Sequence, residues 1–227
     1  MGDDHLRQVR REVRGEAAPF ALAILGANVL LALVSRSAGW ELFGSADWWL
    51  WLLLAVPSAL LFATLVVGTS RIGLERLQRE VAIGLLVLLG LGTGVATLCV
   101  VVSLTNWTPS GPQLLLSAVI VLLTNVITYA LAFWELDDDG PIARALAETR
   151  DHPDFQFPQD ENRELARPGW APALVDYLYL SLTNSVAFSP TDAMPLTHRA
   201  KLVMGLESSI SLVTILVVGA RAINVLG

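Results

Sequence analysis

Hydroxyl, amide and carboxylate side chains gather in the last quarter of this chain, within sequence that is otherwise apolar. Residues 181–192 read SLTNSVAFSPTD, and Glu207 lies in the apolar segment that follows. Polar groups at membrane depth are costly unless they pair with one another or contact ions or water. These residue types therefore predict ion binding or ion passage.

The elements that must position these side chains have unequal lengths. Residues 172–189 are apolar but short, and 173–185 within them read as a helix of about three turns, which is more typical of a re-entrant helix than of a membrane span. Pro190 and Pro195 then interrupt any helix. Residues 197–225 are again helical and long enough to cross a bilayer. The pattern predicts a re-entrant helix and turn followed by a spanning helix.

The rest of the sequence has the composition of a membrane protein. Of its 227 residues, 54% are apolar and only 16% are charged, whereas soluble domains carry about 25% charged residues. Runs of about 20 residues nearly free of charge have the length of a bilayer crossing. They predict four further spans, at about 19–34, 48–67, 81–104 and 114–134. The expected fold class is an all-α, multi-pass integral membrane protein with about five transmembrane helices.

These segments divide the chain into four regions. Residues 1–18 are charged and form either an amphipathic helix on the membrane surface or a solvated tail. Residues 19–134 hold four spans, 135–172 form a polar acidic loop, and 173–227 hold the short helix, the turn and the last span. The run Asp137, Asp138 and Asp139 either concentrates cations near a pore mouth or caps a helix in solvent.

Little in the sequence indicates an enzyme, a metal-binding protein or a nucleotide-binding protein. His5, His152 and His198 are scattered, and the sequence contains no triad and no metal-ligand spacing. The GLGTG motif at 90–94 follows no strand, so it indicates close helix packing rather than a nucleotide site. Cys99 is expected to be a packing residue. We expect no enzyme activity, no cofactor, no metal site and no nucleic-acid partner.

The stretch from Asp176 to Ile223 resembles the pore module of the two-transmembrane-helix potassium-channel family. Residues 179–183, YLSLT, look like the pore helix of that family. Asp192, Pro195 and Thr197 fall at its Asp and P-x-T after the filter, and Glu207 falls at a Glu of its inner helix. Residues 134–141, WELDDDGP, and 187–197, AFSPTDAMPLT, are also similar to an uncharacterised group of bacterial membrane proteins related to these channels. The resemblance implies a homotetramer in the bacterial inner membrane, with the fourth helix as the outer pore helix.

The expected filter departs from the family pattern, T-V-G-Y-G-D. Its glycines allow the backbone conformations that point successive carbonyls at the pore axis. Here Ser189 and Thr191 replace them, and Pro190 fixes φ and removes an amide. The sequence therefore predicts a wide, hydrated and weakly selective pore for a monovalent cation. Its filter residues are Val186, Ala187, Phe188, Ser189, Pro190, Thr191 and Asp192. The alternative, which Pro190 favours, is a non-conducting scaffold or sensor that retains the channel fold.

Two further groups of side chains are expected near the pore. Thr183, Asn184 and Glu207 are predicted to support it, with Glu207 either bracing the loop or handling ions or protons. The polar side chains that follow on the last helix are predicted to line a cavity or a subunit contact. They are Ser208, Ser211 and Thr214.

The positive charges leave the orientation of the pore loop open. With five spans and a re-entrant loop, thirteen of the 15 Lys and Arg residues fall on one side, and only Arg36 and Arg221 on the other. The positive-inside rule places the thirteen in the cytoplasm. The loop would then enter from inside, unless 172–189 spans fully or the first apolar run does not cross.

Overall fold

The computed structural model describes residues 3–41, 48–67, 75–106, 110–146, 153–162, 164, 166, 167, 170–187 and 193–226. The predicted filter residues Phe188, Ser189, Pro190, Thr191 and Asp192 lie outside these ranges. Val186 and Ala187 are described, at the end of a helix.

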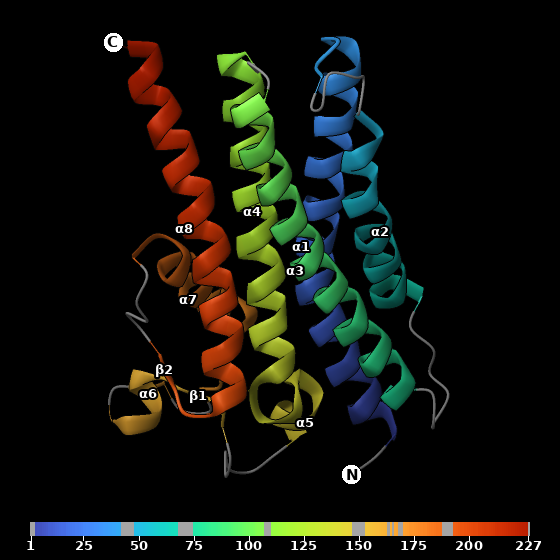
Figure 1. Ribbon diagram of the computed structural model, residues 1–227. Coiled ribbons are helices and arrows are strands. Elements are labelled where there is room, and N and C mark those ends of the chain that lie inside the picture. Colours follow the sequence, from blue (N-terminus) through green and yellow to red (C-terminus); the bar gives the residue numbers. More distant parts are fainter. Residues whose placement is uncertain are drawn as a thin grey trace.

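Five helices in the described residues are long and apolar enough to cross a membrane. They are α1 (Asp3–Ser37), α2 (Leu52–Val67, after the 3-10 turn η1, Trp48–Trp51), α3 (Glu75–Asn106), α4 (Gly111–Leu136) and α8 (His198–Leu226). This arrangement confirms the prediction of an all-α, multi-pass membrane protein. The chain begins at one end of the bundle and ends at the other (Figure 1).

Helix α1 is continuous across Pro19, close to the boundary expected near residue 18. Val9 and Ala17 are buried, and Val13 packs against the same core. At this spacing the three side chains share one helix face. The guanidinium of Arg14 also donates to Gln78 on α3, at 3.2 Å. The face of α1 formed by Val9, Val13 and Ala17 therefore packs against the bundle.

Helix α4 occupies the centre of the bundle, between α1, α3, α7 and α8. In the apolar 18-residue stretch of α4, 72% of the residues are buried. In the corresponding stretch of α8, which lies at the outside of the bundle, only 22% are buried. Its polar side chains Asn125, Thr128 and Tyr129 are buried. Asn28 on α1 is buried too. Polar side chains at membrane depth therefore face other helices rather than lipid.

The chain between α4 and α8 forms small elements at one end of the bundle, together with a short helix. They are η2 (Asp137–Asp139), α5 (Pro141–Leu146), β1 (Phe155–Gln156), α6 (Pro158–Glu161), α7 (Leu174–Ala187) and β2 (Met194–Pro195). Strands β1 and β2 pair antiparallel, with Phe155 opposite Pro195. Because β1 precedes α7 and β2 follows it, both flanks of α7 are held at the same end.

Helix α7 is short for a membrane crossing. Its 14 residues rise about 21 Å, against roughly 30 Å for a bilayer core. It lies beside the N-terminal half of α8 (Figure 1).

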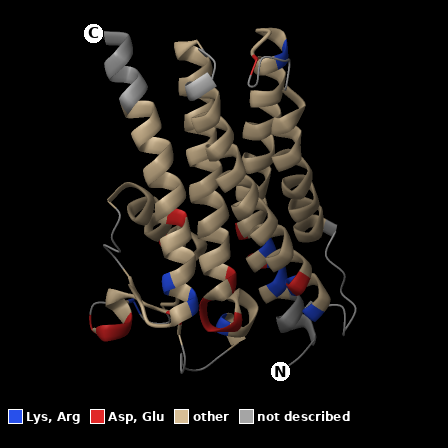
Figure 2. Cartoon of the chain, in the orientation of Figure 1, with Lys and Arg blue, Asp and Glu red and all other residues tan. Residues whose placement is uncertain are grey.

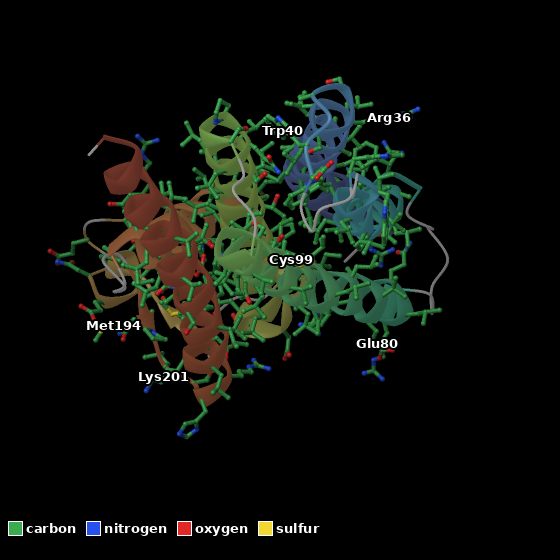
Figure 3. All side chains as sticks on the ribbon, turned by 45° about the horizontal axis from the view of Figure 1, so that its top comes forward. Arg36, Trp40, Glu80, Cys99, Met194 and Lys201 are labelled. Atoms are coloured by element: carbon green, nitrogen blue, oxygen red, sulfur yellow. The ribbon has the colours of Figure 1, made fainter. Side chains whose placement is uncertain are left out.

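The described charged side chains lie mainly at the end that carries the N-terminus, β1 and β2 (Figure 2). Among the described side chains, Arg36 in the last turn of α1 is the positive charge at the other end, where its guanidinium lies 5.0 Å from the ring centre of Trp48 (Figure 3). The charge asymmetry predicted from the sequence is thus present in the fold.

Candidate functional site

Glu207 on α8 is the centre of a buried polar cluster between α8 and α7. Its carboxylate has no exposed surface. One oxygen, Oε1, accepts hydrogen bonds from the hydroxyls of Ser181 and Ser185, the latter at 3.0 Å. The other, Oε2, accepts from the amide of Asn184 at 2.6 Å. A buried carboxylate is tolerated only with such partners, so these donors explain how Glu207 is accommodated.

Helical spacing brings the three donors together. Ser181, Asn184 and Ser185 lie at positions i, i+3 and i+4 of α7 and so share one face. The same face is tied to the backbone of α8, because Asn184 donates to the carbonyl of Met204 at 3.0 Å. In return, Ser208 donates to the carbonyl of Asn184 at 3.2 Å. The cluster therefore fixes the rotation of α7 against α8.

Ser181 lies between two acceptors. Its hydroxyl oxygen is 2.8 Å from the carbonyl oxygen of Val126 on α4 and also contacts Glu207 Oε1. A hydroxyl has one hydrogen, so an ionised Glu207 competes with Val126 for it. A protonated Glu207 instead donates to Ser181, whose hydrogen then goes to Val126, and both contacts are satisfied. Ser181 on α7 thus connects α4 to α8.

The hydroxyls that follow on α8 bind neighbouring helices rather than a cavity. Asn125 donates to Ser211 at 2.9 Å, and the hydroxyls of Thr97 and Thr214 are 3.0 Å apart. Ser211 and Thr214 are both buried. These two side chains, predicted to line a cavity or a subunit contact, thus bond to α4 and α3 of the same chain. Ser208 contacts α7 instead.

The structure brings together some of the predicted supporting residues and not others. Asn184 contacts Glu207, whereas the hydroxyl of Thr183 donates to the carbonyls of Tyr179 and Leu180 in its own helix. Sequence reasoning missed Ser185. Its position four residues after Ser181, on the same helix face, is the signal that identifies it.

Val186 and Ala187 are exposed at the end of α7, away from this cluster. The remaining filter residues are outside the described part of the chain, so their arrangement stays a prediction.

Asp137 at the end of α4 anchors the segment that leads into α7. Its side chain is fully buried, with Oδ1 accepting the backbone amides of Asp154 at 2.7 Å and Phe155 at 3.1 Å. Oδ2 accepts from the hydroxyl of Tyr177 on α7. Buried Arg144 lies 3.9 Å from Oδ2 and donates to the Asp137 carbonyl at 2.8 Å. Both interpretations of the three-aspartate run are therefore wrong for Asp137, because its partners come from within the fold.

Asp154 is the matching anchor for α8. Its carboxylate is fully buried and accepts from the hydroxyl of Thr197 and from both Nε (2.7 Å) and Nη2 of Arg199. Its carbonyl accepts the amide of Leu196 at 2.8 Å. Paired carboxylate–guanidinium forks of this kind are strong and directional. The first turn of α8 is thereby joined to the strand before α7.

Aromatic rings fill the space between these two anchors. Phe155 packs against Phe133 on α4 and Tyr177 on α7, with ring centres 5.2 and 6.2 Å apart. Phe157 lies 5.4 Å from Tyr177 with its ring edge-on, an arrangement that aromatic pairs favour. The guanidinium of Arg144 covers the Tyr177 ring at 5.1 Å. Helix α7 is therefore held at two places: by the aromatic rings at its first turns, and by the hydrogen bonds to Glu207 further along.

Within the described residues, no group of three or more His, Cys, Asp or Glu side chains is placed to hold a metal ion. Cys99 is half-buried in α3. No family model, curated protein or solved structure matches the chain.

Proposed function

We propose that the chain is the subunit of an oligomeric cation channel, in which α7 and the turn after it enter the membrane and return on the same side. One observation carries the proposal. A helix too short to cross the bilayer has both flanks tied to one end of the bundle by β1 and β2, and is braced from behind by the Glu207 cluster. Backbone that turns at membrane depth needs protein around it, and the bracing supplies it.

The resemblance to potassium channels adds the expected assembly, a homotetramer with residues 186–192 around its axis. The face of α8 towards α3, α4 and α7 is occupied within the chain. Its opposite face, which includes Leu202 and Ser209, is exposed. A pore shared between copies would use that exposed face. The permeant ions would meet the oxygen atoms of Ser189, Thr191 and Asp192.

Flux through purified protein in liposomes tests this proposal. We expect potassium and sodium flux and little chloride flux, because rings of carboxylates select cations. In Asp192→Asn the cation flux should fall several-fold, and Pro190→Ala should change the ratio of potassium to sodium flux. Glu161→Gln, a loss of one exposed charge at the same end, is the matched control and should leave flux unchanged. Equal flux in Asp192→Asn and the control would place the conducting path elsewhere.

A non-conducting scaffold or sensor is the second candidate. The observation that favours it is that Glu207, Ser211 and Thr214 are engaged within the chain, so they present no polar surface to an ion. Pro190 at the centre of the predicted filter favours it too. Absence of flux for every ion tried, from folded protein of defined oligomeric state, would support this candidate and exclude the channel.

We further propose that the positively charged end faces the cytoplasm of a bacterial inner membrane, so that α7 enters from inside. Short loops rich in Lys and Arg remain on that side, and Lys201 and Arg36 lie at opposite ends of the bundle (Figures 2 and 3).

Cysteine labelling in intact cells tests the orientation. In a Cys99→Ala background, Ser37→Cys should react with a membrane-impermeant maleimide from outside, and Glu161→Cys only after the cells are opened. Both positions are exposed, at opposite ends of the fold. The reverse labelling pattern would invert the proposed topology while leaving the fold unchanged.

A further inference from the structure

A cavity of about 310 Å³ lies between α3, α4 and α8, at the positively charged end of the bundle. It is separate from the Glu207 cluster, since none of Glu207, Ser181 and Asn184 lines it. The proposed channel function makes no use of it.

The wall of the cavity is mainly apolar and opens at the outer surface of the bundle. Val87 and Leu91 on α3 and Leu206 on α8 line it, and each is more than half exposed. In a bilayer, exposed apolar side chains of spanning helices contact acyl chains. The cavity is thus a groove that a lipid chain can enter from the side.

An unsatisfied polar group lies in the wall. The hydroxyl of Thr128 is buried and has no hydrogen-bond partner. By contrast, the hydroxyls of Thr93 and Thr214 donate to carbonyls of their own helices. A buried polar group without a partner is uncommon and indicates a missing water, ion or ligand.

Charged groups of both signs surround the mouth of the cavity. Arg79 and Arg199 lie there with Glu135 and Asp139. Arg79 donates to the Glu135 carbonyl at 2.9 Å, but its buried Nε has no hydrogen-bond partner and is 3.7 Å from the Glu135 carboxylate. Within the described residues, the hydrogen bonds of Arg199 use Nε and Nη2, which leaves Nη1 available. Two cations and two anions suit a headgroup that itself carries one charge of each sign.

We propose that this cavity binds a membrane phospholipid with a zwitterionic, primary-amine headgroup, as in phosphatidylethanolamine. One acyl chain lies along Val87, Leu91 and Leu206. The phosphate pairs with Arg79 and Arg199, as guanidinium groups favour, and the ammonium donates to Asp139 and Glu135. The ester carbonyls, which follow the phosphate in such a lipid, supply the acceptor that Thr128 lacks.

Native mass spectrometry of protein purified from an equimolar mixture of phosphatidylethanolamine, phosphatidylcholine and phosphatidylglycerol tests the proposal. We expect phosphatidylethanolamine to be retained preferentially, because quaternary choline cannot donate hydrogen bonds and glycerol lacks the positive charge. Val87→Trp should lower retained lipid by about tenfold, because the indole ring fills the groove. Leu88→Trp, on an equally exposed part of α3 outside the cavity, is the matched control and should retain lipid.

A second variant tests the headgroup separately. Asp139→Asn removes one carboxylate at an exposed position, and Asn tolerates the positive φ of 61° found there. It should abolish the preference among headgroups while lipid is still retained. Equal retention by Val87→Trp and Leu88→Trp would overturn the site. So would a change of oligomeric state in Val87→Trp without loss of lipid, since a neighbouring copy would then be the occupant.

Discussion

Replacement of Glu207 by leucine is expected to lower the free energy of unfolding by about 3 kcal/mol, because buried hydrogen-bond donors on α7 would lose their acceptor. Ser181 and Ser185 can redirect their hydroxyls to helix carbonyls, but Asn184 keeps only its bond to Met204 and loses the one to Glu207. Leucine also places a branched side chain against three polar groups. The variant should melt earlier in detergent and, if the chain conducts, lose flux because α7 is released.

Glu207→Gln keeps the shape of the side chain and changes only its hydrogen bonds. Its amide oxygen still accepts from the two serines, while its NH₂ group opposes the amide of Asn184, so we expect a loss of about 1 kcal/mol. Ser209→Leu is the control on the exposed side of α8 and should be neutral. Unfolding followed by circular dichroism ranks the variants. A leucine variant as stable as the parent would show that the cluster contributes no stability.

Asp137→Ala is expected to have the largest effect on folding, a loss of about 3–5 kcal/mol, because it leaves a buried cation without its partner. The Arg144 side chain is only 3% exposed. The same change removes the acceptor for the Tyr177 hydroxyl and for two backbone amides. We therefore expect low yields of folded protein and separation of α7 from the end of α4.

Two variants test this mechanism for Asp137. Asp139→Asn, two residues away and exposed, should melt like the parent. The double variant Asp137→Ala/Arg144→Met should recover part of the lost stability, because replacing a buried ion pair by apolar groups costs much less than breaking it. If the double variant melts no higher than Asp137→Ala, the hydrogen bonds that Asp137 accepts from two amides and a hydroxyl contribute more to stability than its charge does.

The sequence alone determined the spanning helices of this protein. Runs of apolar residues of bilayer length predicted five spanning helices, because the length of a span depends only on consecutive residues. The sequence also placed Thr183, Asn184 and Glu207 in one supporting group, and of these Asn184 and Glu207 are in contact.

Only the tertiary structure decided which polar groups are buried and what they bind. Asp137 and Asp139 look alike in sequence, yet one is fully buried and the other exposed. The partners of Asp137 lie up to 40 residues away, and those of Asp154 up to 45. Ser211 and Thr214 find partners 86 and 117 residues distant. Periodicity reports which way a side chain points, but the free energy of burying a polar group depends on donors and acceptors that distant segments bring to it.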